Sequence, residues 1–184
     1  MDVFCGEGIN SFALVAYLPE PLAAFVEGMR QEAEPGCKAR GHLTFLPPRP
    51  IAASVDQVRA ELEANLRSCS AFRVTLGDVE VFPVSQVVHL AVTAGWNEAR
   101  RIHQSLNHGP CQCKEAFEYH PHVTLAQDLD PEKAAAFAEM ARRQWREYSG
   151  PRDFTVDHLT LVQNTTENCW INLGEFALRV PVSV

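Results

Sequence analysis

The strongest constraint on the fold is an internal repeat, in which the shift that takes His42 onto His122 also aligns the residues around them. The segments "HLTFL" at 42–46 and "HVTLA" at 122–126 share a histidine, a threonine and the apolar positions between them. The same shift aligns the apolar positions of two later segments, 72–82 and 154–162, and both break their alternation at the same place, as a shared β-bulge would. The repeat therefore predicts two copies of one supersecondary unit that pack together.

Apolar periodicity and turn signals place four helices and seven strands along the chain. Helices are expected to begin at Pro21, at a capping box of Ser54 and Gln57, at Asn97 as N-cap, and at Asp130–Pro131, the last ending at Gly150. Strands are expected at 12–18, 42–46, 72–82, 87–93, 122–126, 154–162 and 169–178. The order strand, helix, strand, helix, strand thus occurs twice.

These elements predict the α+β class, with two pseudo-symmetric lobes that enclose a central cleft. Each lobe should contain an antiparallel-rich sheet with helices on its outer face. Residues 1–184 are expected to form one bilobal domain, with the first repeat at about 11–83 and the second at about 84–184.

Charge and composition exclude several classes of function. The formal net charge of -7 opposes binding of duplex or other extended nucleic acid. No apolar stretch in the sequence is long enough to cross a bilayer, so no membrane span is expected. Because Asp2 and Glu7 stand where a secretory signal carries Lys or Arg, we expect a cytoplasmic protein whose six cysteines are thiols.

Side chains in a strand alternate between its two faces, so the histidine and threonine of each triplet share one face. A pseudo-twofold axis between the lobes would bring the two polar faces together across the cleft. The residues expected on these faces are Lys38, Arg40, His42 and Thr44 from the first repeat, and His120, His122 and Thr124 from the second.

Two imidazoles and two hydroxyls in one cleft suit chemistry on a phosphodiester. One neutral histidine can accept a proton from an attacking hydroxyl or water, while a protonated one donates to the departing oxygen. Threonine hydroxyls can donate hydrogen bonds to the non-bridging oxygens, where negative charge shifts during the displacement. This scheme requires neither a metal nor a cofactor.

The motifs "HLTF" at 42–45 and "HVTL" at 122–125, one in each repeat, resemble the hallmark of the 2H phosphoesterase superfamily, which includes 2'-5' RNA ligase-like proteins and cyclic nucleotide phosphodiesterases. The stretches "YHPHVTLAQ" and "FTVDHLTLVQ" are also similar to that family, so the resemblance runs from about Ser11 to Leu178. It implies a bilobal α+β fold and metal-independent action on 2',3'-cyclic or 2'-5'-linked phosphodiesters. It also implies catalysis by His42 and His122 with Thr44 and Thr124.

Other residues are candidates for substrate binding. His89 is expected to line the cleft and stack on a base, although a partly exposed strand histidine is an equally ordinary interpretation. Lys38 and Arg40 could hold a phosphate, or could be a solvated basic stretch before a strand. Trp170 is expected in the core. The substrate is expected to be a nucleotide or a short RNA terminus, and the protein is expected to be a monomer.

Two further interpretations stay open at this point. The first is a non-catalytic module that grips an RNA end or a nucleotide with the same cleft. The second is a zinc or redox protein that uses Cys111 and Cys113, although this spacing is not the C-x2-C of a zinc finger or ribbon.

Overall fold

The computed structural model describes residues 5–180; Asp2, used above to exclude a secretory signal, lies outside this range. The structure contains two four-stranded sheets, and all strand pairs within them are antiparallel. The first sheet has the order β2 (His42–Arg49), β1 (Gly8–Tyr17), β7 (His158–Thr165), β8 (Trp170–Ala177). The second has the order β5 (His122–Ala126), β4 (Val88–Ala94), β3 (Phe72–Val81), β6 (Asp153–Val156). The predicted α+β class with two lobes is confirmed.

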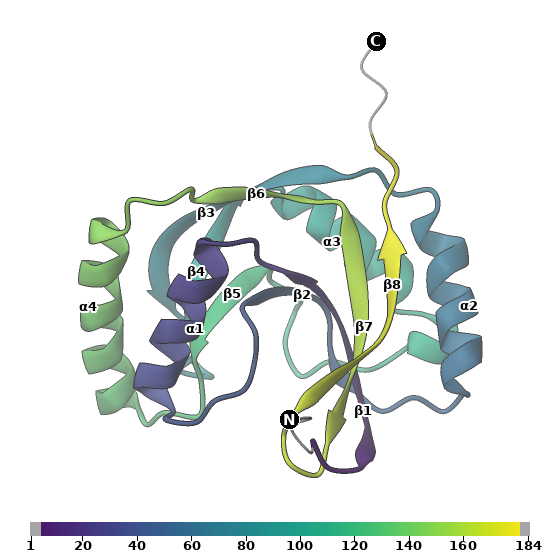
Figure 1. Cartoon of the computed structure of the whole chain (residues 1–184), viewed down its shortest axis with the longest axis horizontal. Coiled ribbons are helices and arrows are strands. Elements are labelled where there is room, and N and C mark those ends of the chain that lie inside the picture. Colours follow the sequence, from purple (N-terminus) through teal and green to yellow (C-terminus); the bar gives the residue numbers. More distant parts are fainter. Residues whose placement is uncertain (1–4, 181–184) are drawn as a thin grey trace.

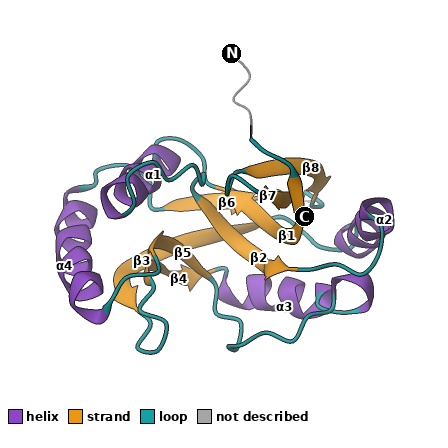
Figure 2. Ribbon diagram, turned by 90° about the horizontal axis from the view of Figure 1, so that it is seen from below, coloured by secondary structure: helices purple, strands orange, loops and turns teal. Residues whose placement is uncertain are grey.

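Four α-helices cover the outer sides of the sheets, with the strands in the centre (Figure 2). They are α1 (Leu22–Ala33), α2 (Val55–Leu66), α3 (Trp96–Leu106) and α4 (Pro131–Glu147), and a 3-10 helix, η1, spans Gly109–Cys111. The predicted capping box of Ser54 and Gln57 is present, and the side chain of Asp130 accepts the first-turn N–H of Lys133 at 2.9 Å. None of the helices within residues 5–180 is long and apolar enough to cross a membrane.

The predicted start of α3 at Asn97 is wrong. An N-cap at Asn97 would make Glu98 the first helical residue, but the helix begins two residues earlier, at Trp96, and Gly95 is its N-cap with a φ of 82°. This left-handed conformation turns the chain directly from β4 into the helix, and a Cβ at Gly95 would lie 2.6 Å from the carbonyl oxygen of Arg73. Backbone conformation, rather than a side-chain cap, therefore sets this boundary.

The two lobes do not correspond to the two repeats. α1 and α4 lie together against the β3–β5 side of the second sheet, whereas α2 and α3 pack on the first sheet, against β8 and β2 (Figure 1). The first sheet combines β1 and β2 from the first repeat with β7 and β8 from the second. Each lobe is thus built from both halves of the chain, and one cluster of buried side chains continues through both.

The pseudo-twofold axis passes through the pairing of β3 with β6. In that antiparallel pair Val74 is opposite Phe154, which is its own counterpart in the repeat. The predicted strand 154–162 is in fact two strands, because at Asp157 the chain leaves the second sheet as β6 and enters the first as β7. At the corresponding place in β3 the register shifts between Leu76 and Val79. The shared break in alternation is thus a bulge in one repeat and a change of sheet in the other.

The expectation that all six cysteines are thiols is wrong for one pair. Cys5 and Cys169 form a disulfide that joins the segment before β1 to the turn between β7 and β8. The pairing of these segments brings the two sulfurs together, since Gly8 pairs with Thr165 and the N–H of Thr166 donates to the carbonyl of Glu7. The remaining cysteines in residues 5–180 are free: Cys37, Cys69, Cys111 and Cys113.

Candidate active site

The two His-x-Thr triplets lie on β2 and β5, which are both edge strands and which contact one another between the lobes. The two strands share one burial pattern, in which the histidine and threonine are half-buried and the apolar residues are buried. A cleft of about 1170 Å³ opens over the polar face of both strands. Of the eight predicted site residues, seven line it: Lys38, Arg40, His42, Thr44, His120, His122 and Thr124.

The two imidazoles are held in the same way. Nδ1 of His42 lies 2.7 Å from the carbonyl oxygen of Arg40, and Nδ1 of His122 lies 2.7 Å from that of His120. Because a carbonyl oxygen can only accept, Nδ1 must carry the proton in both rings. Nε2 is then the nitrogen that gains or loses a proton in each histidine, and it is the atom left for chemistry.

Both histidines are neutral at pH 7 in the free protein. Burial and, after it, the charge of Arg30 lower the pKa of His42 from 6.5 to about 3. Burial also lowers the pKa of His122 to about 4, with smaller contributions from nearby imidazoles and Arg30. Each can therefore accept a proton, and one can donate only if a bound anion first raises its pKa.

Arg30 is a site residue that the sequence analysis missed. Its side chain comes from α1, is 7% exposed and lines the cleft. Nε donates to the carbonyl of Thr124 at 2.9 Å and Nη1 to the carbonyl of Arg40 at 3.2 Å. A positive charge thus lies beside both triplets, where it favours an anionic substrate.

The threonine carbonyls of both triplets receive a side-chain donor from outside their own sheet. An edge strand leaves a row of carbonyls unpaired by the sheet, and a buried one needs another donor. Thr124 receives Nε of Arg30, whereas the carbonyl of Thr44 accepts the hydroxyl of Tyr119 at 2.7 Å. Burial raises the pKa of Tyr119 far above its usual range, so this hydroxyl remains a donor.

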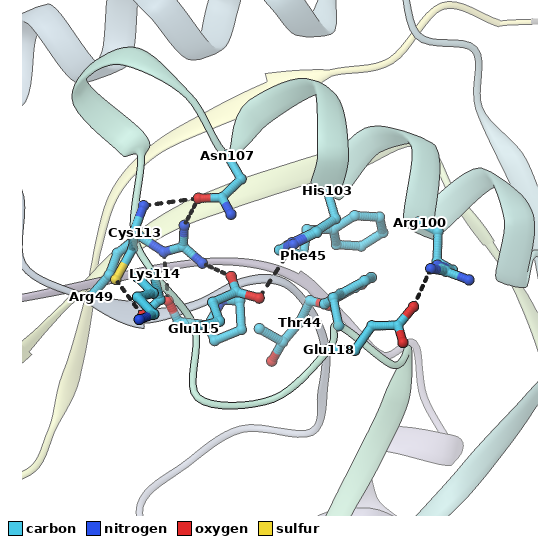
Figure 3. Close-up of polar contacts among 12 residues, drawn as sticks. Thr44, Phe45, Arg49, Arg100, His103, Asn107, Cys113, Lys114, Glu115 and Glu118 are labelled. Carbon is cyan, nitrogen blue, oxygen red and sulfur yellow. Dashed lines mark hydrogen bonds and ion pairs between the residues drawn. The ribbon is translucent and has the colours of Figure 1, made fainter.

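A polar network anchors the segment that precedes β5 (Figure 3). Arg49 forms an ion pair with Glu115 and donates to the side chain of Asn107 at 2.8 Å. His103 lies between the carbonyl of Phe45, 2.8 Å from Nδ1, and Glu115, 3.4 Å from Nε2. Its ring also stacks on Tyr119, with 3.9 Å between centroids. The network thereby connects the loop to the carbonyl of Thr44.

His89 does not line the cleft, contrary to the prediction. Its side chain is fully buried, and the ring of Phe82 stacks on it with 3.9 Å between centroids. Burial lowers the pKa of His89 to about 4, and Nδ1 contacts the carbonyl of Val87 at 3.2 Å. The strand alternation gave the correct face of β4, but Phe82 covers that face and takes the position in the cleft.

Aromatic and apolar side chains form another part of the cleft lining. Tyr17 and Trp170 pack on a small cluster of buried residues formed by Ala13, Val15 and Val162, and all five line the cleft. The prediction that Trp170 lies in the core is therefore wrong, because its side chain lines the cleft. Phe82 and Val162 are counterparts in the repeat, at the ends of the aligned segments 72–82 and 154–162.

The described residues provide no cluster of metal-binding side chains: within residues 5–180, no group of three or more His, Cys, Asp and Glu is placed to hold a metal ion. Cys111 is buried, and its carbonyl accepts Nη1 of Arg49 at 2.9 Å. The zinc hypothesis for Cys111 and Cys113 gains no support from this geometry.

Comparison with solved structures places the fold among known ones. LigT from E. coli in its apo form is similar with a TM-score of 0.62 and 19% sequence identity, over 92% of this chain and 98% of that one. TT0787 of Thermus thermophilus is similar with a TM-score of 0.57 and 18% identity, over 92% and 98% of the two chains. No curated protein sequence matches the chain.

A family model resolves what these distant structural similarities leave open. The model of the 2'-5' RNA ligase superfamily matches residues 18–168, which is more than half of the chain and includes both triplets and Arg30. The resemblance seen in the two His-x-Thr motifs is confirmed, and the protein belongs to the 2'-5' RNA ligase superfamily of 2H phosphoesterases.

Proposed function

We propose that the protein is a metal-independent phosphodiesterase that acts on 2',3'-cyclic or 2'-5'-linked phosphodiesters of nucleotides or RNA ends. The observation that carries the proposal is the matched pair of imidazoles, each with Nδ1 fixed by a carbonyl and Nε2 left free, in one cleft with two threonines. Such a pair can perform both proton transfers of a displacement at phosphorus.

In the hydrolytic direction, water attacks phosphorus and gives one proton to Nε2 of one histidine. The bond from phosphorus to the leaving oxygen breaks, its electron pair stays on that oxygen, and the second histidine supplies the proton. The net change is the addition of one water to the diester. The hydroxyls of Thr44 and Thr124 donate to the non-bridging oxygens, and the charge of Arg30 stabilises the anion.

The lining of the cleft supports a nucleotide as substrate. The rings of Phe82, Tyr17 and Trp170 offer apolar surface for a base or sugar, and Lys38 adds positive charge at the rim. LigT from E. coli, which shares this fold, has been crystallised with 3'-AMP and with ATP. The net charge of -7 favours a short terminus over an extended strand.

The test is an assay of 2',3'-cyclic nucleotides beside a panel of 2'-5'-linked and 3'-5'-linked dinucleotides, with and without EDTA. We expect turnover of at least one 2'-type substrate that EDTA does not abolish, and a loss of about 10² to 10⁴ in His42→Ala or His122→Ala. Loss of activity on chelation with rescue by a metal would refute metal independence. Nucleotide binding without turnover of any substrate would instead identify a non-catalytic binding module.

A further inference from the structure

The two histidines sit in nearly equivalent positions, but their surroundings differ in charge. The carbonyl oxygen of Arg40 accepts from Nδ1 of His42 at 2.7 Å and also from Nη1 of Arg30 at 3.2 Å. A proton on Nε2 of His42 would therefore put a second positive charge across one carbonyl from a guanidinium. That arrangement disfavours the imidazolium form.

The counterpart carbonyl in the second repeat carries no such cation. The carbonyl of His120 accepts Nδ1 of His122 at 2.7 Å, and within residues 5–180 it receives no other side-chain donor. Arg30 instead donates to the carbonyl of Thr124, which follows His122 by two residues in β5. The guanidinium is thus coupled through a shared acceptor to His42 alone.

Charged and titratable groups around each histidine follow the same asymmetry. Those acting on His42 are Arg30 from α1 and His122 from β5, while the guanidinium of Arg40 lies 3.7 Å from the ring centre of Tyr17, the strand partner of His42. Those acting on His122 are His89 from β4, His120 and, with the smallest contribution, Arg30.

A carboxylate close to Arg30 favours its charged form. Glu27 opposes the lowering of the Arg30 pKa by burial, and it is fixed by accepting the N–H of Gly41 at 2.9 Å. A guanidinium stays protonated at any pH relevant to an enzyme. The asymmetry between the two histidines is therefore permanent.

We propose that Arg30 makes the two histidines unequal, so that His42 is the neutral proton acceptor and His122 is the imidazole that becomes protonated and donates. This assignment rests on the proposed function. In hydrolysis, water transfers its proton to Nε2 of His42, and Nε2–H of His122 protonates the leaving oxygen as its bond to phosphorus breaks. In the division of roles between the histidines, Arg30 acts through His42 and is a positioning residue, apart from the stabilisation that its charge gives the anion. The charge of Arg30 is the second cause, after burial, of the lowered pKa of His42, whereas it is the smallest of the causes that act on the pKa of His122, which agrees with this order.

The first test measures both histidines by NMR in the free protein, without any substrate. Arg30→Gln removes the charge but keeps an N–H donor, and should raise the proton affinity of His42 about tenfold, and more than that of His122. Arg30→Lys retains the charge and should leave His42 close to the wild type. Tyr119→Phe is the matched control, because it removes the donor to the carbonyl of Thr44 without a change of charge. An equal rise for both histidines in Arg30→Gln would overturn the proposal.

The second test uses the leaving group and does not depend on the folding of an Arg30 variant. The leaving oxygen of a nucleoside p-nitrophenyl phosphodiester needs no acid, whereas a ribose oxygen does. His122→Ala should therefore lose about 10² or more in turnover of a 2',3'-cyclic nucleotide but recover most of it on the nitrophenyl ester, while His42→Ala stays impaired on both. Recovery in His42→Ala in place of His122→Ala would reverse the assignment.

The two tests separate failure of this assignment from failure of the proposed function. If neither alanine variant loses activity on any substrate, the two-histidine mechanism itself is wrong. If both lose activity but both or neither recover on the nitrophenyl ester, the function stands and the division of roles between His42 and His122 is refuted.

Discussion

A nucleotide phosphate that enters the cleft should bring about uptake of a proton by His122. With a pKa of about 4, only about one molecule in a thousand carries this proton at pH 7 in the free protein. An anionic phosphate oxygen about 4 Å from Nε2 contributes about 4 kcal/mol at an effective dielectric constant near 20. This energy corresponds to a rise of about three pKa units, which would bring the pKa of His122 to about 7 in the complex.

Calorimetry of 3'-AMP binding at pH 6, in buffers that differ in ionisation enthalpy, measures this uptake directly. We expect close to one proton taken up by the wild type beyond that exchanged by the phosphate of the ligand itself. The comparison variants correct for the ligand: His122→Asn should lose the uptake, and His42→Asn should retain it. The same proton number in wild type and His122→Asn would refute the reasoning, since His122 would then not be the group that takes up the proton.

Three further outcomes are expected. Thr44→Val and Thr124→Val keep the shape of the site but remove a donor, so each should slow turnover by about 10²-fold while circular dichroism shows an intact fold. Since both histidines are neutral when folded and have a pKa of 6.5 when unfolded, stability should be fully present above pH 6.5 and fall below it, by up to about 1.4 kcal/mol per pH unit for each histidine. Urea unfolding from pH 4.5 to 7.5 measures this slope, which His42→Asn should reduce. Reduction of the Cys5–Cys169 disulfide should lower the melting temperature, with an entropic upper limit of about 5 kcal/mol for so long a loop, and Cys169→Ser should melt alike with and without reductant.

The strands, most helix starts and the triplets could be predicted because they depend on local patterns. Alternation places histidine and threonine on one face, and the capping box at Ser54 is a property of four adjacent residues. Because the two triplets occupy equivalent positions in the repeat, a twofold axis between the repeats would also bring the polar faces of their strands together. The pairing of Val74 with Phe154 supplies that axis.

The depth of a side chain could not be predicted in the same way. His89 is on the expected face of β4, but the hairpin that joins β3 and β4 places the ring of Phe82 over it. Arg30 had a usable signal: it lies eight residues after Leu22 and four after Val26, on the buried stripe of α1. A charged residue on such a stripe is rare unless it has partners, and that rarity marks it as a candidate for a site.

The exchange of elements between the lobes could not be inferred from periodicity, because a helical stripe does not specify which sheet it covers. This exchange is nevertheless what completes the site. The carbonyl of Thr44, from the first repeat, receives its donor from Tyr119 of the second, and the carbonyl of Thr124, from the second repeat, receives Arg30 of the first. Each edge strand would be left with a buried carbonyl unpaired if its own repeat folded alone. Neither half of the chain can therefore form the surroundings of its own triplet without the other. The repeat accounts for the presence of two motifs, and the exchange of helices and loops between the lobes brings them together in one site.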